Sequence, residues 1–172
     1  MAIRQIVTRG DEILAKNCKS IKQITPRIRA LAEDLIDTMR ASNGVGLAAP
    51  QVGVIKQIFV ACPDAPNMED VIVMINPEIT YREGEQICTE GCLSVPGYIG
   101  LVKRPLKIKI KYQDLEGSWN EEEYEDFGAN VICHEYDHLS GVLYTEKTER
   151  LMTEEEYEEY MNEQQEQEEE RS

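Results

Sequence analysis

The chain of 172 residues has the length of a single domain, and its 41% of apolar residues suffices for one hydrophobic core. No apolar run approaches the roughly 20 residues that a membrane-spanning helix needs. The net charge of −15 gives no general attraction to nucleic acid or anionic lipid, so we expect neither specific DNA binding nor membrane binding. The first residues match neither a secretory signal nor a transit peptide, and we therefore expect a cytoplasmic protein.

The negative charge is concentrated at the end of the chain. Residues 153–172 hold ten Glu and one Arg, which is more than half of the net charge. We expect a folded domain over residues 1–152, followed by an acidic Glu/Gln-rich tail that forms a fraying helix or stays disordered. With few apolar residues to bury, this tail is expected to be dispensable for catalysis.

Two helices and a series of strands are predicted in chain order. Thr25 is suited to cap a helix that starts at Pro26, has apolar residues at helical spacing and ends at 42–44. A second helix is predicted from Asp126 to Leu139. Strands are predicted between them at 55–61, 71–75, 78–83, 106–112 and 119–124. A helix, then strands, then a helix indicates an α+β fold.

The only two histidines of the chain, His134 and His138, lie four residues apart in the second predicted helix. Residues at this spacing project from the same helix face, so both imidazoles can bind one cation. Glu135 lies between them, as in the His-Glu-x-x-His pattern of zinc sites whose Glu is a general base. Two buried core histidines, or a solvated helix face, are the alternatives without a metal.

The His-Glu-x-x-His pattern alone does not specify the third metal ligand. A third His is impossible, and position 144, where metzincins have one, is Tyr144. The remaining choices are a downstream glutamate, such as Glu146 or Glu149, or a cysteine thiolate. The five cysteines are odd in number and form no Cys-x-x-Cys pair, which argues against disulfides and against a structural zinc site. We favour Cys92, because Gly91 before it lets the backbone approach a metal closely.

Three segments together resemble a known family. Segments 44–51 (GVGLAAPQ), 90–94 (EGCLS) and 134–138 (HEYDH) are similar, in this order, to the three motifs of the peptide deformylases. The resemblance implies antiparallel β-sheets packed around a central helix that carries the His-Glu-x-x-His motif, with residues 1–152 as the catalytic domain. It also implies a hydrolase that removes the formyl group from the N-terminal formyl-methionine of nascent polypeptides, by attack of a metal-bound water.

The resemblance also assigns roles to individual residues. One Fe²⁺ per chain, replaceable by Zn²⁺, Ni²⁺ or Co²⁺, would be held by Cys92, His134 and His138. Glu135 would be the general acid/base, and Gln51 and the backbone N–H of Leu93 would stabilise the oxyanion. The residues expected to bind substrate are Gly44, Val45, Gly46, Cys88, Glu90, Gly91, Phe127 and Val131. The expected partners are nascent formyl-methionyl polypeptides and, transiently, the ribosome, and the protein is expected to be a monomer.

The chain departs from the family pattern at three places. Cys133 stands where the family commonly has Gln, and residues 98–101 lack the Arg that many members carry after a Pro-Gly like that at 96–97. The acidic tail replaces the basic C-terminal helix with which some members bind the ribosome, so docking on RNA by that route is not expected.

The main alternative function is that of a zinc endopeptidase of the His-Glu-x-x-His type with a tail Glu as third ligand. An endopeptidase of this type would leave Cys92 and Gln51 without a role. A second alternative, a non-catalytic binding module, does not account for the intact motifs.

Overall fold

The computed structural model describes residues 2–172. The chain begins with a short 3-10 helix, η1 (Glu12–Ala15), and the first α-helix, α1 (Pro26–Ala41). The Thr25 side chain accepts the N–H of Ile28 at 3.3 Å and caps α1, as predicted. The remaining elements are β1 (Gly46–Ala48), η2 (Ala49–Val52), β2 (Ile58–Ala61), β3 (Ile72–Glu83), β4 (Gln86–Cys92), β5 (Val95–Arg104), β6 (Lys107–Gln113), β7 (Trp119–Glu125), α2 (Asp126–His138), η3 (Tyr144–Glu146), β8 (Thr148–Thr153) and α3 (Glu154–Arg171).

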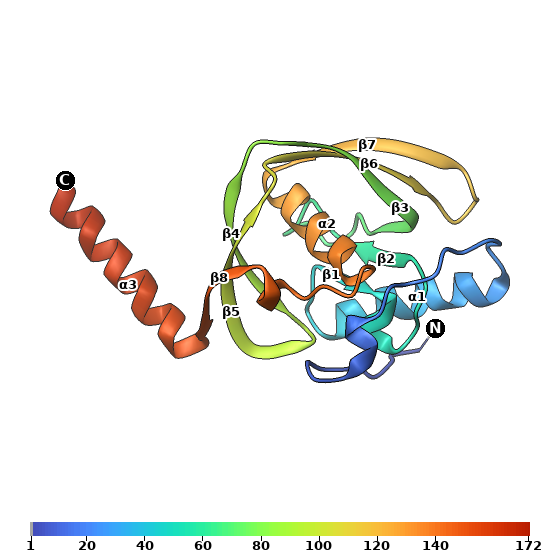
Figure 1. Ribbon diagram of the computed structural model, residues 1–172, viewed down its shortest axis with the longest axis horizontal. Helices are drawn as coiled ribbons and strands as arrows, with labels where there is room; N and C mark the ends of the chain where they lie inside the picture. Colours follow the sequence, from blue (N-terminus) through green and yellow to red (C-terminus); the bar gives the residue numbers. More distant parts are fainter. Residues whose placement is uncertain (1) are drawn as a thin grey trace.

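The strands form two antiparallel sheets around α2. A five-stranded sheet has the order β1-β2-β3-β6-β7, and a three-stranded sheet has the order β4-β5-β8. Figure 1 shows α2 enclosed by these strands, while α1 lies beside β1 and β2. The expected single-domain α+β fold, with antiparallel sheets around the helix of the His-Glu-x-x-His motif, is therefore confirmed.

The core explains why α2 lies in the centre. Most of its residues from Gly128 to His138 are buried, and its apolar side chains pack against residues of the five-stranded sheet such as Phe59 and Ile108. Burial of this kind supplies most of the stability of a short helix. The buried stretch also contains polar side chains, which are costly to desolvate without a partner. Their presence at the centre of the fold indicates a functional site.

The sequence analysis missed β1, β4, β5 and β8, and for β4 the cause is an inverted pattern of burial. On β4 the apolar Ile87 is 56% exposed, whereas the charged Glu90 is 4% exposed. A pattern that assigns apolar residues to the interior cannot identify such a strand. The predicted strands 71–75 and 78–83 form one long strand, β3, which continues through a register shift between Ile75 and Glu78.

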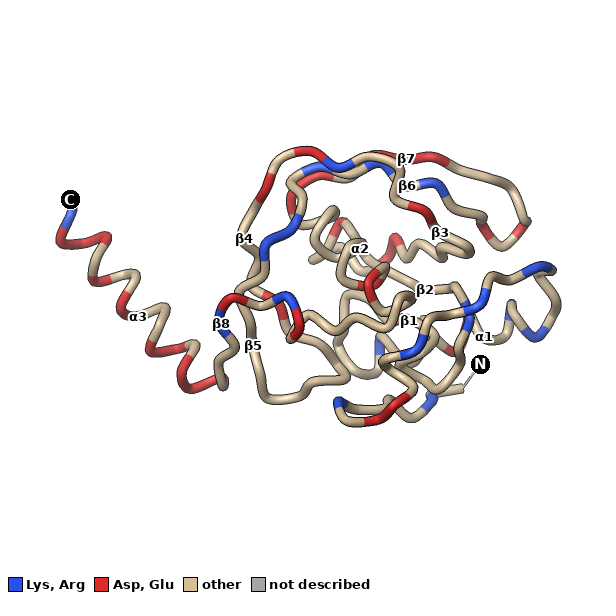
Figure 2. The backbone as a smooth tube through the Cα atoms, in the orientation of Figure 1, with Lys and Arg blue, Asp and Glu red and all other residues tan. Residues whose placement is uncertain are grey.

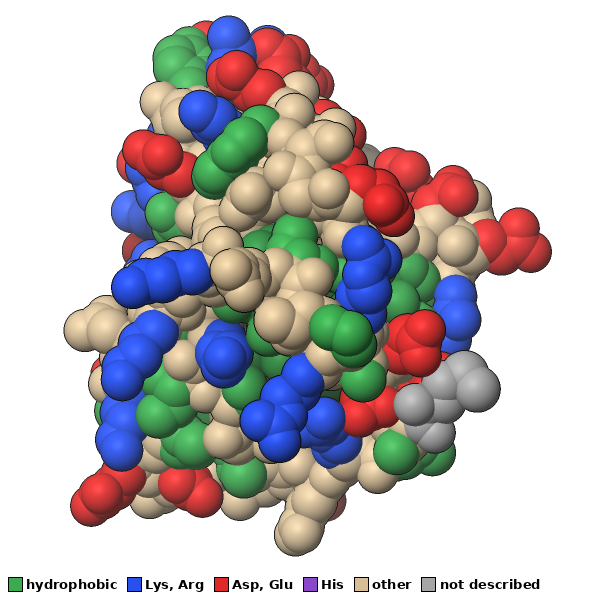
Figure 3. Space-filling view, turned by 90° about the vertical axis from the view of Figure 1, so that its right-hand side faces the viewer, with side chains coloured by type: hydrophobic (Ala, Val, Ile, Leu, Met, Phe, Trp, Pro, Cys, Tyr) green, Lys and Arg blue, Asp and Glu red, His purple; other side chains and the backbone are tan. Residues whose placement is uncertain are grey.

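The acidic tail forms a helix in the structure. Thr153 is the last residue of β8 and caps α3 by accepting the N–H of Glu156 at 3.2 Å. No residue of α3 is buried, and the helix points away from the rest of the protein (Figure 1). Figure 2 shows acidic residues all along α3, whereas Figure 3 shows many Lys and Arg side chains on the opposite end of the molecule. The division of the chain after residue 152 stays a prediction.

None of the helices within residues 2–172 combines the length and the apolar composition that crossing a bilayer requires.

Candidate metal centre and active site

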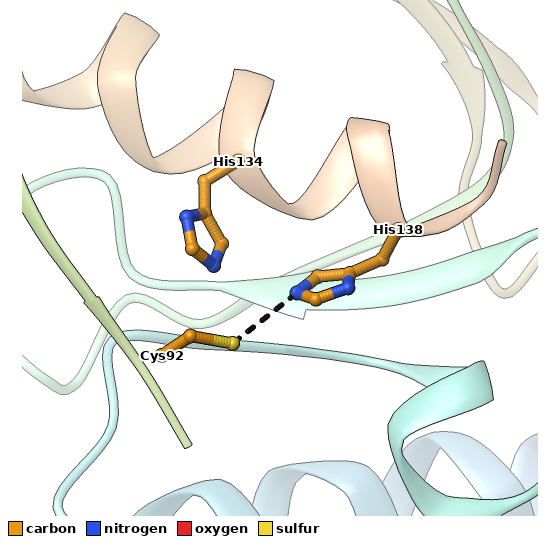
Figure 4. Close-up of side chains that lie close together, drawn as sticks. All are labelled: Cys92, His134 and His138. Atoms are coloured by element: carbon orange, nitrogen blue, oxygen red, sulfur yellow. Dashed lines mark hydrogen bonds between the residues drawn. The ribbon is translucent and has the colours of Figure 1, made fainter. Parts of the chain in front are cut away.

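Cys92, His134 and His138 lie together although they come from different elements. Cys92 ends β4, whereas the two histidines project from α2 one turn apart, as Figure 4 shows. Their candidate ligand atoms all lie within 4.8 Å of one another, and Cys92 Sγ is 3.5 Å from His138 Nε2. A thiolate and two imidazoles are donors that suit Fe²⁺ or Zn²⁺ better than Mg²⁺. The cluster therefore fits one transition-metal ion, and three protein ligands leave a position for a reacting molecule.

Glu90 holds the His134 ring in place. One oxygen of its carboxylate is hydrogen-bonded to His134 Nδ1 at 2.6 Å, and the other accepts from Asn130 Nδ2 at 2.8 Å. Such a bond at one ring nitrogen orients the other toward a metal. Burial alone would lower the pKa of His134, but its hydrogen bonds with Cys92 and Glu90 raise that pKa well above the usual value. Glu90 therefore orients a candidate ligand, and the substrate-binding role predicted for it stays a prediction.

Arg104 neutralises the buried Glu90. Its guanidinium donates to the two Glu90 oxygens at 2.7 and 2.8 Å and to Asp137 at 2.6 Å. Burial would raise the pKa of Glu90, but the hydrogen bonds from Arg104 and His134 lower it to about 2. Sequence reasoning missed Arg104 and Asn130, because neither belongs to a motif and Arg104 lies on a strand that was not predicted. A buried charge of this kind is retained only where a partner compensates it.

Gln51 directs its side-chain amide toward the cluster. The amide oxygen accepts a hydrogen bond from the backbone N–H of Ala48 at 2.9 Å, and this bond fixes the orientation of the amide group. Its Nε2 then lies 3.5 Å from Cys92 Sγ and 3.1 Å from Ser94 Oγ. The side chain is 1% exposed, so it is a preoriented donor in a dry setting. Leu93 directly follows Cys92, and its backbone N–H is therefore close to the same cluster.

Glu135 is a buried carboxylate with a free oxygen. It is 4% exposed, and its Oε1 has no hydrogen-bond partner within the described residues. Burial raises its pKa to about 7. A Cβ atom at Gly46 would lie 2.5 Å from Glu135 Oε2, so only glycine fits against this side chain. An unpaired buried carboxylate with a pKa near neutrality is typical of an acid–base group.

A cavity of about 380 Å³ opens beside the cluster. Of the residues expected to bind substrate, the cavity is lined by Gly44, Val45, Gly46, Glu90, Gly91, Phe127 and Val131. Cys88 is not part of the lining: it is 7% exposed and lies in the interior, where burial raises its pKa to about 11. Its predicted contact with substrate is therefore not supported. A neighbouring hollow of about 570 Å³ shares Asn43, Val45 and Phe127 with the cavity.

The fold and the site define a class of enzyme: an α+β hydrolase with a Cys-His-His cluster next to a buried glutamate. Residues 3–154 match the family model of polypeptide deformylase. The peptide deformylase of Thermoanaerobacter pseudethanolicus is 48% identical over 158 residues, which cover 92% of this chain and 97% of the relative. The chain belongs to the polypeptide deformylase family, whose members are enzymes that remove formyl groups.

Solved structures agree with this assignment. A crystal structure of peptide deformylase from Thermotoga maritima has a TM-score of 0.83 at 36% identity and covers 87% of this chain and 100% of its own. A peptide deformylase from Synechococcus elongatus, determined in complex with actinonin, has a TM-score of 0.79 at 35% identity and covers 84% of this chain and 78% of its own. The resemblance inferred from the three motifs is confirmed, and the endopeptidase alternative finds no support.

Proposed function

We propose that this chain removes the formyl group from the N-terminal formyl-methionine of nascent polypeptides, with one metal ion held by Cys92, His134 and His138. One arrangement carries the proposal. The donor atoms of these three residues converge within 4.8 Å, and the same cavity receives the unpartnered carboxylate of Glu135 and the amide of Gln51. These are the parts that hydrolysis of an amide requires.

The acid–base work is assigned to Glu135. A bound metal ion supplies Lewis-acid polarisation and lowers the pKa of water. Glu135 takes up the proton of the attacking water and passes it to the nitrogen of the leaving amine, which departs as the free N-terminus. A pKa of about 7, set by burial, lets the carboxylate accept and release a proton near neutral pH.

The developing negative charge on the formyl oxygen needs hydrogen-bond donors. Gln51 Nε2 is held toward the cluster by the bond between its amide oxygen and Ala48, and we assign the backbone N–H of Leu93 as the second donor. One such donor typically stabilises a transition state by about 2.7–4 kcal/mol. Neither donor carries a charge, so each stabilises the oxyanion through a hydrogen bond that strengthens as negative charge develops.

The substrate is proposed to lie extended along β1. This strand is at the edge of the five-stranded sheet, where an added peptide strand can pair with its backbone. Gly46 keeps the approach to Glu135 open, and an apolar slot for the methionine side chain is formed by Val45, Phe127 and Val131. A formyl group on a methionine can thereby reach the cluster.

We propose Fe²⁺ as the native ion, with Zn²⁺, Ni²⁺ and Co²⁺ as substitutes, since one thiolate and two imidazoles accept all four. Fe²⁺ held by Cys92, His134 and His138 would be open to oxidation, as would the Cys92 sulfur. Activity of the Fe²⁺ form should therefore decay in air, and that of the Ni²⁺ form should persist. Equal half-lives of the Fe²⁺ and Ni²⁺ forms in air would contradict this prediction of oxygen sensitivity.

We further propose a cytoplasmic monomer that meets its substrates at the ribosome.

Release of formate from formyl-Met-Ala-Ser tests the activity, with protein prepared and assayed under anaerobic conditions. An unformylated peptide of eight or so residues, with the same first three, is the matched control for endopeptidase action. We expect formate from the first peptide and no cleavage of the second. Cleavage of the internal bonds, or no formate from protein that contains metal, would contradict the proposal.

A further inference from the structure

Tyr144 is a buried aromatic residue that lies beside the cluster. It is the first residue of η3, which follows α2, and it is 1% exposed. Its ring is stacked against the His134 imidazole, with the two ring centroids 5.9 Å apart and the ring planes inclined by 29°. Tyr144 also forms a small apolar cluster with Val95 and Val102, against which Cys92 packs. Tyr144 therefore lies next to two of the three candidate metal ligands.

The Tyr144 ring restrains the His134 imidazole in a way that Glu90 does not. The bond from Glu90 to Nδ1 acts at the edge of the imidazole and directs the other ring nitrogen toward the cluster (Figure 4). An aromatic ring packed against the face of the imidazole limits how far its plane can tilt. The centroid distance of 5.9 Å lies within the range of about 4.5–7 Å at which aromatic rings attract one another.

The Tyr144 hydroxyl reaches the wall of the substrate cavity. It donates a hydrogen bond to the backbone oxygen of Tyr98 at 3.2 Å, and Tyr98 lines the cavity. Tyr98 lies on β5 between Val95 and Gly100, in the stretch where the register between β4 and β5 shifts. Because the strand ladder is disrupted at such an irregularity, an added hydrogen bond restrains the backbone there.

Gly100 provides the space in which the Tyr144 ring lies. A Cβ atom at Gly100 would be 2.8 Å from Tyr144 Cε2 and 2.7 Å from Thr148 Oγ1, which is closer than packed atoms come. The ring is therefore held between the backbone of β5 on one side and the His134 imidazole on another. Close packing of this kind leaves a side chain little freedom to move.

We propose that Tyr144 is a positioning residue with two roles: its ring holds the His134 imidazole for the metal ion, and its hydroxyl holds the cavity wall at Tyr98 for the substrate. The inference rests on the proposed metal centre and deformylase function and adds a residue to both. Two substitutions separate the roles, because Tyr144→Phe removes only the hydroxyl, whereas Tyr144→Leu removes the aromatic ring as well.

The affinity for Zn²⁺, measured by competition between metal-free protein and a chelator, tests the role of the ring. We expect Tyr144→Leu to bind Zn²⁺ about three- to tenfold more weakly than the wild type, as for the loss of one aromatic pair, and Tyr144→Phe to bind it equally well. Tyr112→Leu is the matched control, since Tyr112 is a buried tyrosine of β6 that does not line the cavity. Wild-type affinity in Tyr144→Leu, or an equal loss in Tyr112→Leu, would overturn this role.

The values of KM and kcat for formyl-Met-Ala-Ser, measured with metal-loaded protein, test the role of the hydroxyl. We expect Tyr144→Phe to raise KM about two- to tenfold, as for the loss of one hydrogen bond, and to leave kcat within about twofold of the wild type. Tyr112→Phe removes a hydroxyl that is bonded to Glu122 at 3.0 Å, and it should change neither value. An unchanged KM in Tyr144→Phe, or an equal rise in Tyr112→Phe, would show that the hydroxyl has no such role.

Circular dichroism confirms that each variant is folded. If Tyr144→Leu does not fold, Tyr144→Met, with a flexible side chain that fills irregular spaces, is judged by the same Zn²⁺ affinity. Failure of the proposed function would look different, because the wild type would then bind Zn²⁺ but release no formate. A wrong assignment of Tyr144 would instead leave the wild type active and its Tyr144 variants equal to it.

Discussion

The carboxylate of Glu90 and the Nδ1 atom of His134 are 2.6 Å apart, and this contact joins β4 to the centre of α2. Because Cys92 lies two residues after Glu90, the same short piece of strand supplies one candidate metal ligand and orients another. Arg104 compensates the Glu90 charge from the adjacent strand β5. The geometry of the cluster therefore depends on a buried ion pair as well as on its three ligands.

Replacing Arg104 by Met should destabilise the protein and weaken metal binding. Arg104 is 3% exposed, and removing it leaves Glu90 as an uncompensated buried charge, which typically costs about 3–5 kcal/mol. Loss of the support for a metal-ligating His typically lowers metal affinity about 10–100-fold. Urea unfolding and metal titration measure the two effects. Lys103→Met is the control, since Lys103 is exposed and its ion pair with Glu149 should contribute less than about 1 kcal/mol. Equal losses in the two variants would contradict the role of Arg104.

Glu135→Gln and Cys92→Ala should both be inactive but differ in metal content. Glu135→Gln keeps the size of the side chain and removes its ability to take up a proton. We expect about one metal ion per chain in this variant and turnover reduced by roughly 10²–10⁴-fold or more. Cys92→Ala removes the soft anionic donor, so this variant should lose metal. Elemental analysis of the anaerobically purified variants measures their metal content. A metal-free Glu135→Gln variant, or a Cys92→Ala variant with full metal and activity, would show that the roles are assigned wrongly.

Gly46→Ala should reduce activity through a steric effect on Glu135. The added methyl group would lie 2.5 Å from Glu135 Oε2, so the carboxylate has to move. Displacement of a catalytic group by about 1 Å can cost about 100-fold in rate. Gly128→Ala is the matched control, because its methyl group on α2 would meet its nearest neighbour, Tyr124 Cδ1, at an ordinary 3.4 Å. Deformylation rates of the two variants, with circular dichroism to confirm folding, test this. A Gly46→Ala variant as active as Gly128→Ala would refute the steric argument.

Asp34 should stabilise the protein in a way that depends on pH. It lies on α1 and accepts hydrogen bonds from Arg4 Nε at 2.8 Å and from the backbone N–H of Ala2 at 2.7 Å. Burial would raise the pKa of Asp34, but these bonds lower it from 3.8 to about 2. Because the folded pKa lies below the unfolded one, the stabilisation is present above about pH 4 and is lost as the pH falls through about 2.

Asp34→Asn should therefore lower the free energy of unfolding by about 1–2 kcal/mol at pH 7 and by progressively less below pH 4. Urea unfolding of the wild type and the variant between pH 7 and pH 3 measures the difference. Asp37→Asn, one turn further along α1, is the control, because Asp37 makes no ion pair within the described part of the chain. A difference that is the same at every pH would rule out the ionised carboxylate as its source.

The local sequence was sufficient to predict those features whose signals lie within one helical turn or one short motif. The capping Thr25 and the following Pro26 define the start of α1, and the spacing of His134 and His138 places two candidate ligands on one helix face. The order of the three motifs was enough to indicate the family that the comparisons confirm. Each helix cap, helix spacing or motif lies within a few consecutive residues, so it can be recognised without knowledge of the fold.

The tertiary structure determines which distant side chains contact those residues. Only the packing of β4 and β5 against α2 brings Glu90 to His134 and adds Arg104, which lies on a strand that the sequence analysis did not predict. Packing also removes Cys88 from the cavity and places Glu154 at it. A buried charge is tolerated only where distant residues supply its partner, and no local pattern specifies which residues those are.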